Sequence, residues 1–274
     1  KPYHYNKIKN HPLVPSDFLF DSVDDNNDVK FDNESEDEEE DSFNSKYMKC
    51  EGGDNINSKE KNYSELTFHY WFWKNKIKEF SDDDWIGFCQ KRRFWLNSRN
   101  ENLNNKLEDI ILKDFPSEWT NYNAVICEPI KLGTKLMKLL KRGWRNLLIN
   151  PKILFNLKNS SIKLHFDMHH GYGVLDKAIN VLKEEDREEF RSYVNNRSVY
   201  NPHIMFVSKK KIMEKYFNDV FPWLLECEKI FGFDDLKGYD QTRLYAYLSE
   251  RYLSFWFKKY SKYIEWPWVF KDIN

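Results

Sequence analysis

The chain has 274 residues, and its 43 Lys and Arg residues nearly balance 44 Asp and Glu residues, which leaves a formal net charge of −1. This balance excludes a uniformly basic nucleic-acid-binding protein, and a mean hydropathy of −0.80 without an 18-residue apolar run excludes a membrane-spanning helix. Aromatic residues make up 17% of the chain, enough to build a large core inside a charged surface. The chain as a whole is therefore not disordered.

Charge is unevenly distributed along the chain. The segment 21–45 holds twelve acidic residues and one base, Lys30, so its net charge is −11 and the remaining residues sum to +10. We expect this acidic segment to be a solvated loop outside the core. The alternative is that it competes with nucleic acid for a basic face. The residues outside this segment carry a net positive charge, which favours binding to an anionic ligand or an anionic membrane surface.

The spacing of apolar residues predicts short strands that alternate with longer helices. In the first half we expect a helix over 63–80, strands at 85–89 and 124–127, a helix over 132–140 and a weak strand at 147–154. In the second half we expect a strand at 161–166, helices over 173–182 and 184–195, a strand at 203–207, a long helix over 209–231 broken or bent at Pro222, and a helix over 241–259. This order favours an α/β or α+β domain.

The four cysteines are widely spaced and form no zinc-binding pattern, which favours buried, reduced thiols. The chain starts without a charged-then-apolar signal peptide, so the simplest expected location is the cytoplasm. Its first residue is Lys rather than Met, and we expect that some N-terminal residues precede it.

A carboxylate and two imidazoles follow the strand expected at 161–166. Asp167 and a neighbouring histidine could ligate Mn or Zn, or bind sugar hydroxyls. Because adjacent side chains on a strand point to opposite faces, at most one histidine can join Asp167, and His169 is the candidate. The structural alternative is a polar strand end with ordinary hydrogen bonds, and both interpretations stay open.

Two further positions carry charge beside apolar runs. Arg92 and Arg93 follow the strand at 85–89, where guanidinium groups could hold a diphosphate or pair with a structural carboxylate. Glu250 lies inside the apolar pattern of the last helix, where a carboxylate is costly unless it is paired or used. Its neighbour Arg251 lies about 100° round the helix and is not expected to pair with it. We expect Glu250 to face a cleft as a general base, and a buried salt bridge to Arg92 or Arg93 is the alternative.

Four motifs occur in the order of a known family. They are DNINSKEKNYSELTFHYWFWKN, DWIGFCQKRRFW, NPHIMFVSKKKIMEKYFNDVFPWLLECEK and YLSERYLSFWF. Together they resemble the capsular and exopolysaccharide glycosyltransferases long catalogued only as a domain of unknown function. The resemblance runs from about Asp54 to Trp256, and Lys1-Pro2-Tyr3 is similar to the end of the family's opening strand. The family's "HYRRY" motif reads QKRRF here, so its His and first Tyr are replaced by Gln90 and Lys91 while the arginine pair is kept.

The resemblance implies an α/β fold of the GT-A type, with a Rossmann-type mixed sheet flanked by helices and a helical C-terminal half. It implies glycosyl transfer from a nucleotide-diphosphate donor, with UDP-galactose favoured, to a growing capsular or surface glycan. The residues that it assigns are Glu250 as the catalytic base, Pro2, Tyr3, Asp54, Asn55, Arg92 and Arg93 at the donor, and Trp71, Trp73, Asn201, His203 and Arg251 at the acceptor or cleft. Core packing is the alternative for both Trp residues.

We expect a strand and loop region of the catalytic domain at 1–20, an acidic mobile insertion at 21–50, and a glycosyltransferase-like catalytic domain at 51–274. A UDP-sugar is the expected cofactor, and a divalent metal ion, Mn or Mg, stays open. The expected partner is a glycan or lipid-linked glycan, peripheral membrane association stays open, and no nucleic acid is expected. A catalytically inactive binding module of the same fold and a nucleic-acid-binding protein are the alternative functions.

Overall fold

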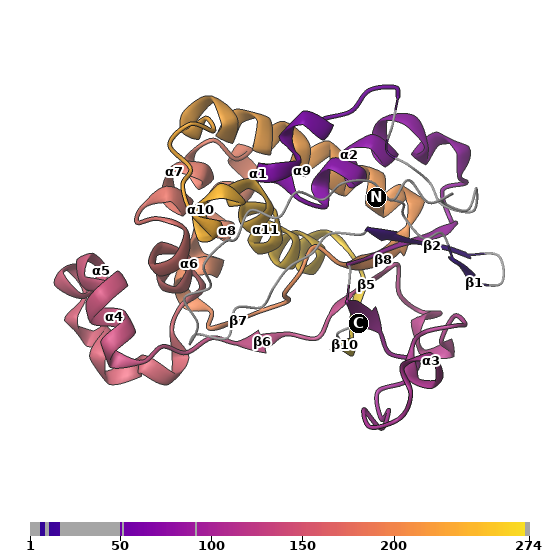
Figure 1. Cartoon of the computed structure of the whole chain (residues 1–274), viewed down its shortest axis with the longest axis horizontal. Coiled ribbons are helices and arrows are strands. Elements are labelled where there is room, and N and C mark those ends of the chain that lie inside the picture. The colour runs from indigo at the N-terminus through magenta and orange to yellow at the C-terminus, as the bar shows by residue number, and fades with distance from the viewer. Residues whose placement is uncertain (1–5, 9–10, 17–49, 51, 91, 272–274) are drawn as a thin grey trace, which may run out of the picture.

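The computed structural model describes residues 6–8, 11–16, 50, 52–90 and 92–271. The acidic segment 21–45 and the donor candidates Pro2 and Tyr3 lie outside these residues. In the described part of the chain, a mixed sheet has the order β1 (Asn6–Ile8), β2 (His11–Ser16), β3 (Trp85–Gln90), β8 (Phe206–Lys209), β5 (Ala124–Cys127) and β9 (Tyr263–Trp266) (Figure 1). Two more strands, β4 (Arg93–Trp95) and β10 (Trp268–Phe270), continue it from the end of β3.

Parallel and antiparallel neighbours both occur in this sheet. Strand β2 runs parallel to β3 and β9 runs parallel to β5, whereas β8 is antiparallel to both β3 and β5. The predicted strands at 85–89 and 124–127 are confirmed as β3 and β5. The expectation of an α/β fold with a mixed sheet is confirmed at this level.

The sheet has a hydrophobic core on each face, because side chains alternate along its strands. On β3, Ile86 and Phe88 enter the larger core together with the helices α1 (Glu60–Tyr63), α2 (Leu66–Asn75), α9 (Lys210–Phe231) and α11 (Leu244–Tyr260). Trp85, from the same strand, enters a second core rich in tryptophan on the opposite face. Because both faces are covered, the central strands read as continuous apolar runs.

Helix α9 is a single element of 22 residues that contains Pro222 without a break. The other helices form a second group at one side of the molecule: α6 (Ile162–His170), α7 (Val174–Asn180), α8 (Glu184–Asn196) and α10 (Tyr239–Thr242), with α4 (Leu136–Arg142) and α5 (Trp144–Ile149) outermost (Figure 1). The remaining elements are α3 (Leu107–Ile110), the paired strands β6 (Ile130–Lys131) and β7 (Val199–Tyr200), and the 3₁₀ segments η1 (Asn57–Lys59), η2 (Ile77–Glu79), η3 (Ser117–Trp119) and η4 (Pro151–Asn159).

Two predicted strands are wrong. Residues 161–166 form the start of helix α6, and residues 147–154 belong to α5 and η4. Helix α6 is packed on two sides: Ile162 and Phe166 enter the main core, while Leu164 and Met168 pack against α4, α5 and η4. A helix with two buried faces shows apolar residues at every second position over a short window, which imitates a strand.

Candidate functional site

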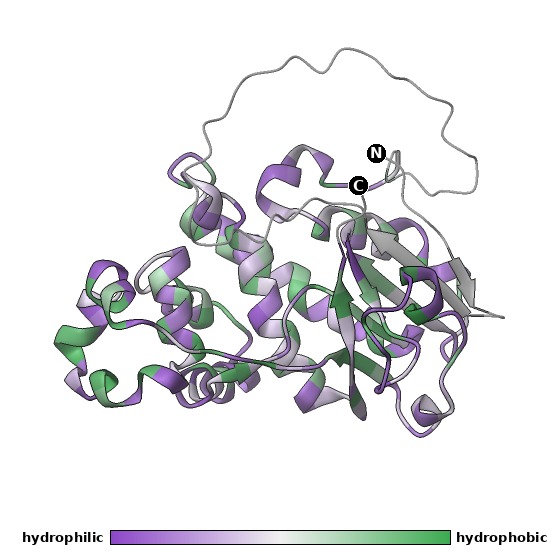
Figure 2. Ribbon diagram, turned by 60° about the horizontal axis from the view of Figure 1, so that its bottom comes forward, coloured by the Kyte–Doolittle hydropathy of each residue, from purple (hydrophilic) through white to green (hydrophobic). Residues whose placement is uncertain are grey.

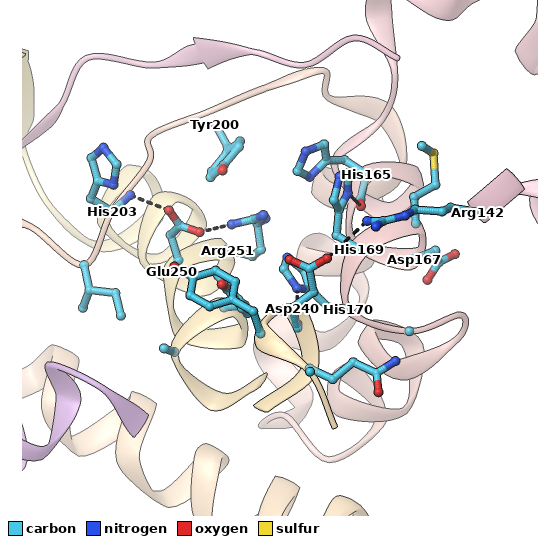
Figure 3. A pocket seen from close by; sticks show the side chains of 18 of the residues that line it. Arg142, His165, Asp167, His169, His170, Tyr200, His203, Asp240, Glu250 and Arg251 are labelled. Atoms are coloured by element: carbon cyan, nitrogen blue, oxygen red, sulfur yellow. Dashed lines mark hydrogen bonds and ion pairs between the residues drawn. The ribbon is translucent and has the colours of Figure 1, made fainter. Parts of the chain in front are cut away.

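A cleft of about 830 Å³ opens where the carboxyl end of β3 and the segment before β8 meet the helices α4, α6, α10 and α11 (Figure 3). Ligands of open α/β sheets bind at such strand ends. The residues that line it are Gln90, Arg93, Lys138, Arg142, His165, Asp167, Met168, His169, His170, Gly171, Tyr200, His203, Ile204, Lys237, Gly238, Tyr239, Asp240, Gln241, Ala246, Tyr247, Glu250 and Arg251.

Glu250 lies in this cleft with 13% of its side chain exposed. Its Oε1 accepts a hydrogen bond from the backbone N–H of His203 at 2.6 Å, and its Oε2 accepts one from the Arg251 guanidinium (Figure 3). The expectation that Arg251 does not pair with Glu250 is therefore wrong. The two Cα positions diverge round the helix, but the long Arg251 side chain reaches back to its neighbour's carboxylate, which remains available to the cleft.

Arg251 is 2% exposed, and its guanidinium lies over the ring of Tyr200 at 4.2 Å from the centroid. The burial and the ring contact fix the guanidinium beside Glu250. A buried Arg requires a compensating negative charge, so Glu250 and Arg251 form one structural unit on α11.

His203 has a left-handed backbone with φ of +70°, which is uncommon for a residue with a Cβ. This conformation aims its N–H at Glu250, while its ring meets the edge of Trp268 at 4.3 Å between centroids. Burial lowers the pKa of the His203 ring well below the ordinary value, with Arg93 and Arg251 adding to the effect. The imidazole is therefore neutral at pH 7 and can accept or donate a hydrogen bond in the cleft.

The two consecutive arginines follow β3, and both guanidinium groups lie over the ring of Phe270. Arg93 lines the cleft and is 7% exposed; burial lowers its pKa, and Glu65 and Glu250 act in the opposite direction. Arg92 has a φ of +62° in the turn, and its guanidinium lies over the ring of Phe270 at 5.3 Å. Arg92 does not line the cleft, and its expected contact with the donor stays a prediction.

A group of histidines from α6 forms the other end of the cleft (Figure 3). His165 and His169 are one helical turn apart and stack at 4.3 Å between centroids. His170 stacks on Tyr247 at 3.9 Å, and its Nδ1 lies 2.7 Å from the backbone oxygen of Asp240. Burial lowers the pKa of all three rings, that of His165 to about 2, so these rings are neutral at pH 7.

The proposed metal pair does not assemble. Because residues 162–170 are helical, Asp167 and His169 point in different directions: Asp167 Oδ2 pairs with Lys163 at 2.7 Å, while His169 Nδ1 lies 2.8 Å from the backbone oxygen of His165. Within the described residues, no group of three or more His, Cys, Asp or Glu side chains is placed to hold a metal ion. The residues present therefore do not fit a metal site at Asp167 and His169.

Three residues expected at the acceptor or cleft lie elsewhere. Trp71 is 5% exposed in the main core, where its Nε1–H donates to the backbone oxygen of Gly52, and Trp73 stacks on Phe221 at 5.3 Å. Asn201 is fully buried, and its side-chain amide donates to the backbone oxygen of Cys127 at 2.7 Å. None of the three lines the cleft, and their packing agrees with the structural alternative for the two Trp residues, while an acceptor contact stays a prediction.

The donor candidates Asp54 and Asn55 are exposed and do not line the cleft. The backbone N–H of Asp54 donates to Asn75 Oδ1 at 3.1 Å, and its carboxylate accepts from the Tyr70 hydroxyl at 3.2 Å. These contacts attach the segment to α2, and its expected contact with the donor stays a prediction.

Several residues that line the cleft were not predicted from the sequence. Tyr200, Tyr239 and Tyr247 supply rings, and Arg142 pairs with Asp240 at 3.2 Å across the mouth between α4 and α10. The available signal was the turn-rich stretch Gly238-Tyr239-Asp240 directly before an apolar helix. Five Lys or Arg side chains and three carboxylates line the cleft, so its net charge favours an anionic ligand.

Comparison with known proteins places the chain in a family. The model of the family described as "Domain of unknown function (DUF4422)" matches residues 35–262. The chain belongs to this family. The DUF4422 match agrees with the resemblance to a family catalogued as a domain of unknown function, and no curated protein matches the chain.

A solved structure shares the DUF4422 chain's fold. It is the apo structure of the bifunctional glycosyltransferase WbbM, with a TM-score of 0.61 and 19% identity over 82% of this chain. The similarity covers 39% of the WbbM chain, so this protein spans about two fifths of that length. No helix in the described residues is long and apolar enough to cross a membrane.

Proposed function

We propose that this protein is a glycosyltransferase that moves a sugar from a nucleotide-diphosphate donor to an acceptor hydroxyl, with residues 51–274 as its catalytic unit. The observation that carries the proposal is Glu250, a carboxylate held at the strand-end cleft by the His203 N–H and Arg251. The shared fold with a glycosyltransferase supports the reaction class. A UDP-galactose-type donor and a growing capsular or surface glycan are the substrates that the sequence motifs favour.

The donor's leaving group defines the first requirement of this reaction. When the bond from the anomeric carbon to the diphosphate breaks, negative charge develops on the diphosphate, and fixed cations stabilise it. Arg93 is the cation that lines the cleft from the sheet, and Lys138, Arg142 and Lys237 add positive charge at its other side. The planar guanidinium of Arg93 suits paired hydrogen bonds to phosphate oxygens.

The acceptor defines the second requirement. Its hydroxyl oxygen attacks the anomeric carbon, and its proton must move to a base. The Arg251 guanidinium and the His203 N–H both orient the Glu250 carboxylate at the cleft, where it can accept a hydrogen bond, and then the proton, from an acceptor hydroxyl. The neutral ring of His203 lies beside it and can orient a second sugar hydroxyl.

We assign a protein side chain rather than a metal ion to the diphosphate, because each carboxylate in the cleft already pairs with a cationic side chain. Asp167 pairs with Lys163, Asp240 pairs with Arg142 and Glu250 pairs with Arg251. Arg93, at the end of the sheet, is therefore the group that we assign to this role.

The test measures release of the nucleotide diphosphate from a panel of UDP- and GDP-sugars by the purified full chain, with and without divalent metal. We expect at least one UDP-sugar to be consumed, and we expect Glu250→Gln to lower turnover by about a hundredfold or more while UDP binding is kept. The matched control is Glu228→Gln, since Glu228 is also a partly buried carboxylate with two donors, Lys59 and Tyr63, but lies outside the cleft.

Loss of activity through misfolding is separated by a second variant. Glu250→Gln combined with Arg251→Met removes the buried cation together with its partner, so this double variant should fold stably and still be inactive. If no nucleotide sugar is consumed and UDP gives no thermal shift, the proposal is wrong. UDP binding without turnover would indicate the inactive binding module, and a thermal shift with DNA alone would indicate a nucleic-acid-binding protein.

A further inference from the structure

The helices outermost from the sheet form a projecting arm, which we define as residues 131–159. It contains α4, α5 and η4, which contact one another and extend from the body at the left of Figures 1 and 2. One side of the arm packs on α6 through a small core of Leu139, Leu164 and Met168, with Leu147, Ile153 and Leu157 beside them. The arm is thus a structured part of the protein with one buried side.

The rest of the arm exposes large apolar side chains to solvent. Phe155 is 91% exposed, Met137 is 76% exposed, and Leu148 and Ile149 are each 72% exposed. The further apolar side chains exposed on the arm are Leu136, Leu140, Trp144 and Leu154. Eight such residues within one short segment are far more than the scattered apolar side chains of an ordinary surface, and a concentration of this kind indicates an interaction site.

The charge of the arm is entirely positive. Residues 131–159 contain no Asp or Glu and eight Lys or Arg residues, namely Lys131, Lys135, Lys138, Lys141, Arg142, Arg145, Lys152 and Lys158. The arm itself therefore supplies no carboxylate to these bases, and the partner of Arg142 is Asp240 on the neighbouring helix α10. Apolar side chains and an excess of positive charge thus occupy the same segment.

We propose that the arm docks this protein on an anionic lipid bilayer. Leu, Ile, Phe and Trp side chains of short amphipathic helices enter the boundary between headgroups and acyl chains, while Lys and Arg side chains bind the lipid phosphates. Trp144 lies at the start of α5 with the Arg145 guanidinium 5.3 Å from its ring, a pairing suited to the interfacial zone. A second copy of this chain is a poorer occupant, because two surfaces that lack acidic residues repel each other.

Docking through the arm also fixes where the cleft opens. Lys138 and Arg142 of α4 line the cleft, so its mouth lies next to the proposed lipid-facing side. An acceptor carried on a membrane lipid would then reach the cleft without leaving the bilayer surface. This last step rests on the proposed function, whereas the docking itself does not.

The experiment is flotation of the purified full chain with vesicles of phosphatidylcholine alone or of phosphatidylcholine with phosphatidylglycerol. We expect binding to the anionic vesicles that weakens as sodium chloride is added. Two triple variants of the arm should reduce vesicle binding. The apolar variant, Leu148→Ser with Ile149→Ser and Phe155→Ser, should reduce it by about tenfold or more. The lysine variant, Lys135→Gln with Lys141→Gln and Lys152→Gln, should reduce it by about fivefold per charge. None of these residues lines the cleft.

Matched controls carry the same changes outside the arm. Leu103→Ser with Leu225→Ser and Ile230→Ser replaces three other exposed apolar residues, and Lys61→Gln with Lys78→Gln and Lys106→Gln removes three other exposed charges. Both controls should bind vesicles like the parent chain. Because the lysine variant leaves the packed side of the arm untouched, it tests the proposal even if the apolar variant misfolds.

Three results would overturn the proposal. They are absence of binding to anionic vesicles, equal loss of binding in arm and control variants, and a sedimentation mass that falls in the arm variants while vesicle binding is unchanged. The last result would identify a second copy as the occupant. Vesicle binding needs no nucleotide sugar, so its failure is distinguishable from failure of the proposed glycosyl transfer.

Discussion

Single residues of the cleft combine structural and chemical roles. Glu250 neutralises the buried Arg251 and also presents an oxygen to the cleft, while His203 adopts a left-handed backbone that directs its N–H to that carboxylate. A residue with φ near +70° costs free energy unless its surroundings hold it, and such positions concentrate at functional sites. The hydrogen bond to Glu250 and the packing of the ring against Trp268 both hold His203 in this conformation.

The pair of Glu250 and Arg251 leads to a prediction about stability. Glu250→Gln leaves a buried guanidinium without its counter-charge, so we expect the free energy of unfolding to fall by about 3 kcal/mol. Adding Arg251→Met should recover most of this loss, because Met can occupy the site on Tyr200 without a charge to compensate. Urea unfolding of the parent chain, both single variants and the double variant measures the coupling. Additive effects of the two substitutions would contradict the pairing.

Arg93 gives a prediction about binding. Arg93→Lys keeps the charge but removes the planar pair of donors, so UDP affinity should fall about tenfold in calorimetric titration. Arg99→Lys is the control, because Arg99 contacts Glu128 at 3.2 Å outside the cleft. Equal UDP affinity in Arg93→Lys and the parent chain would place the diphosphate elsewhere.

At the scale of elements, helices α8 and α11 are joined by one buried carboxylate. Asp186, in the first turn of α8, accepts hydrogen bonds from Tyr252 at 2.7 Å and from Tyr260, and it pairs with Lys259 at 2.9 Å. Burial acts to raise the pKa of Asp186, but these donors outweigh it, and the pKa is lowered overall. The carboxylate is therefore ionised in the folded protein and holds the last helix against the helical side of the molecule.

Removal of this carboxylate should be costly. Asp186→Ala leaves the buried hydroxyl of Tyr252 without its acceptor, whereas Lys259 keeps Glu189 as a partner at 2.9 Å, so we expect a loss of about 2 kcal/mol in the free energy of unfolding. Glu188→Ala is the matched control on the same helix, since the side chain of Glu188 is 82% exposed and should change stability by less than about 0.5 kcal/mol. Equal losses for both variants in urea unfolding would contradict this role of Asp186.

At the scale of the whole molecule, buried ionisable groups make stability depend on pH. His69 lies fully buried between Phe88, Phe206 and Phe217, and neither ring nitrogen has a hydrogen-bond partner in the described part of the chain. Burial lowers its pKa to about 3. Burial raises the pKa of the Glu65 carboxyl to about 7, so Glu65 acts in the opposite direction.

The signs follow from proton uptake. Between pH 6.5 and 3 the unfolded chain protonates His69 and the folded chain does not, so this group lowers stability as pH falls. Between pH 7 and 4.5 the folded chain holds an extra proton on Glu65, so that group raises stability as pH falls. His69→Leu isolates the contribution of the histidine. The free energy of unfolding of this variant, relative to that of the parent chain, should rise by about 1.4 kcal/mol as the pH falls from about 7.5 to 5.5. A pH-independent difference in urea unfolding would show that His69 binds protons equally in the folded and unfolded states, against the lowered pKa.

The sequence by itself determined the features that local pattern controls. Apolar runs defined β3 and β5, and the helical spacing of apolar positions defined the long helices α9 and α11. The order of these elements predicted an α/β or α+β fold, and the motifs predicted the family and, through it, the α/β fold. These features depend on residues that are close together in the chain, so they can be predicted without knowledge of the tertiary structure.

Only the tertiary structure decided which side chains meet. The helical form of 162–170 depends on packing from two sides, and it separates Asp167 from His169. The pairing of Glu250 with Arg251 depends on the buried ring of Tyr200, and the burial of Trp71 and Asn201 depends on segments distant in the chain. Burial and contact are set by elements that are remote in sequence, and the same residue types serve a core or a cleft according to what packs against them.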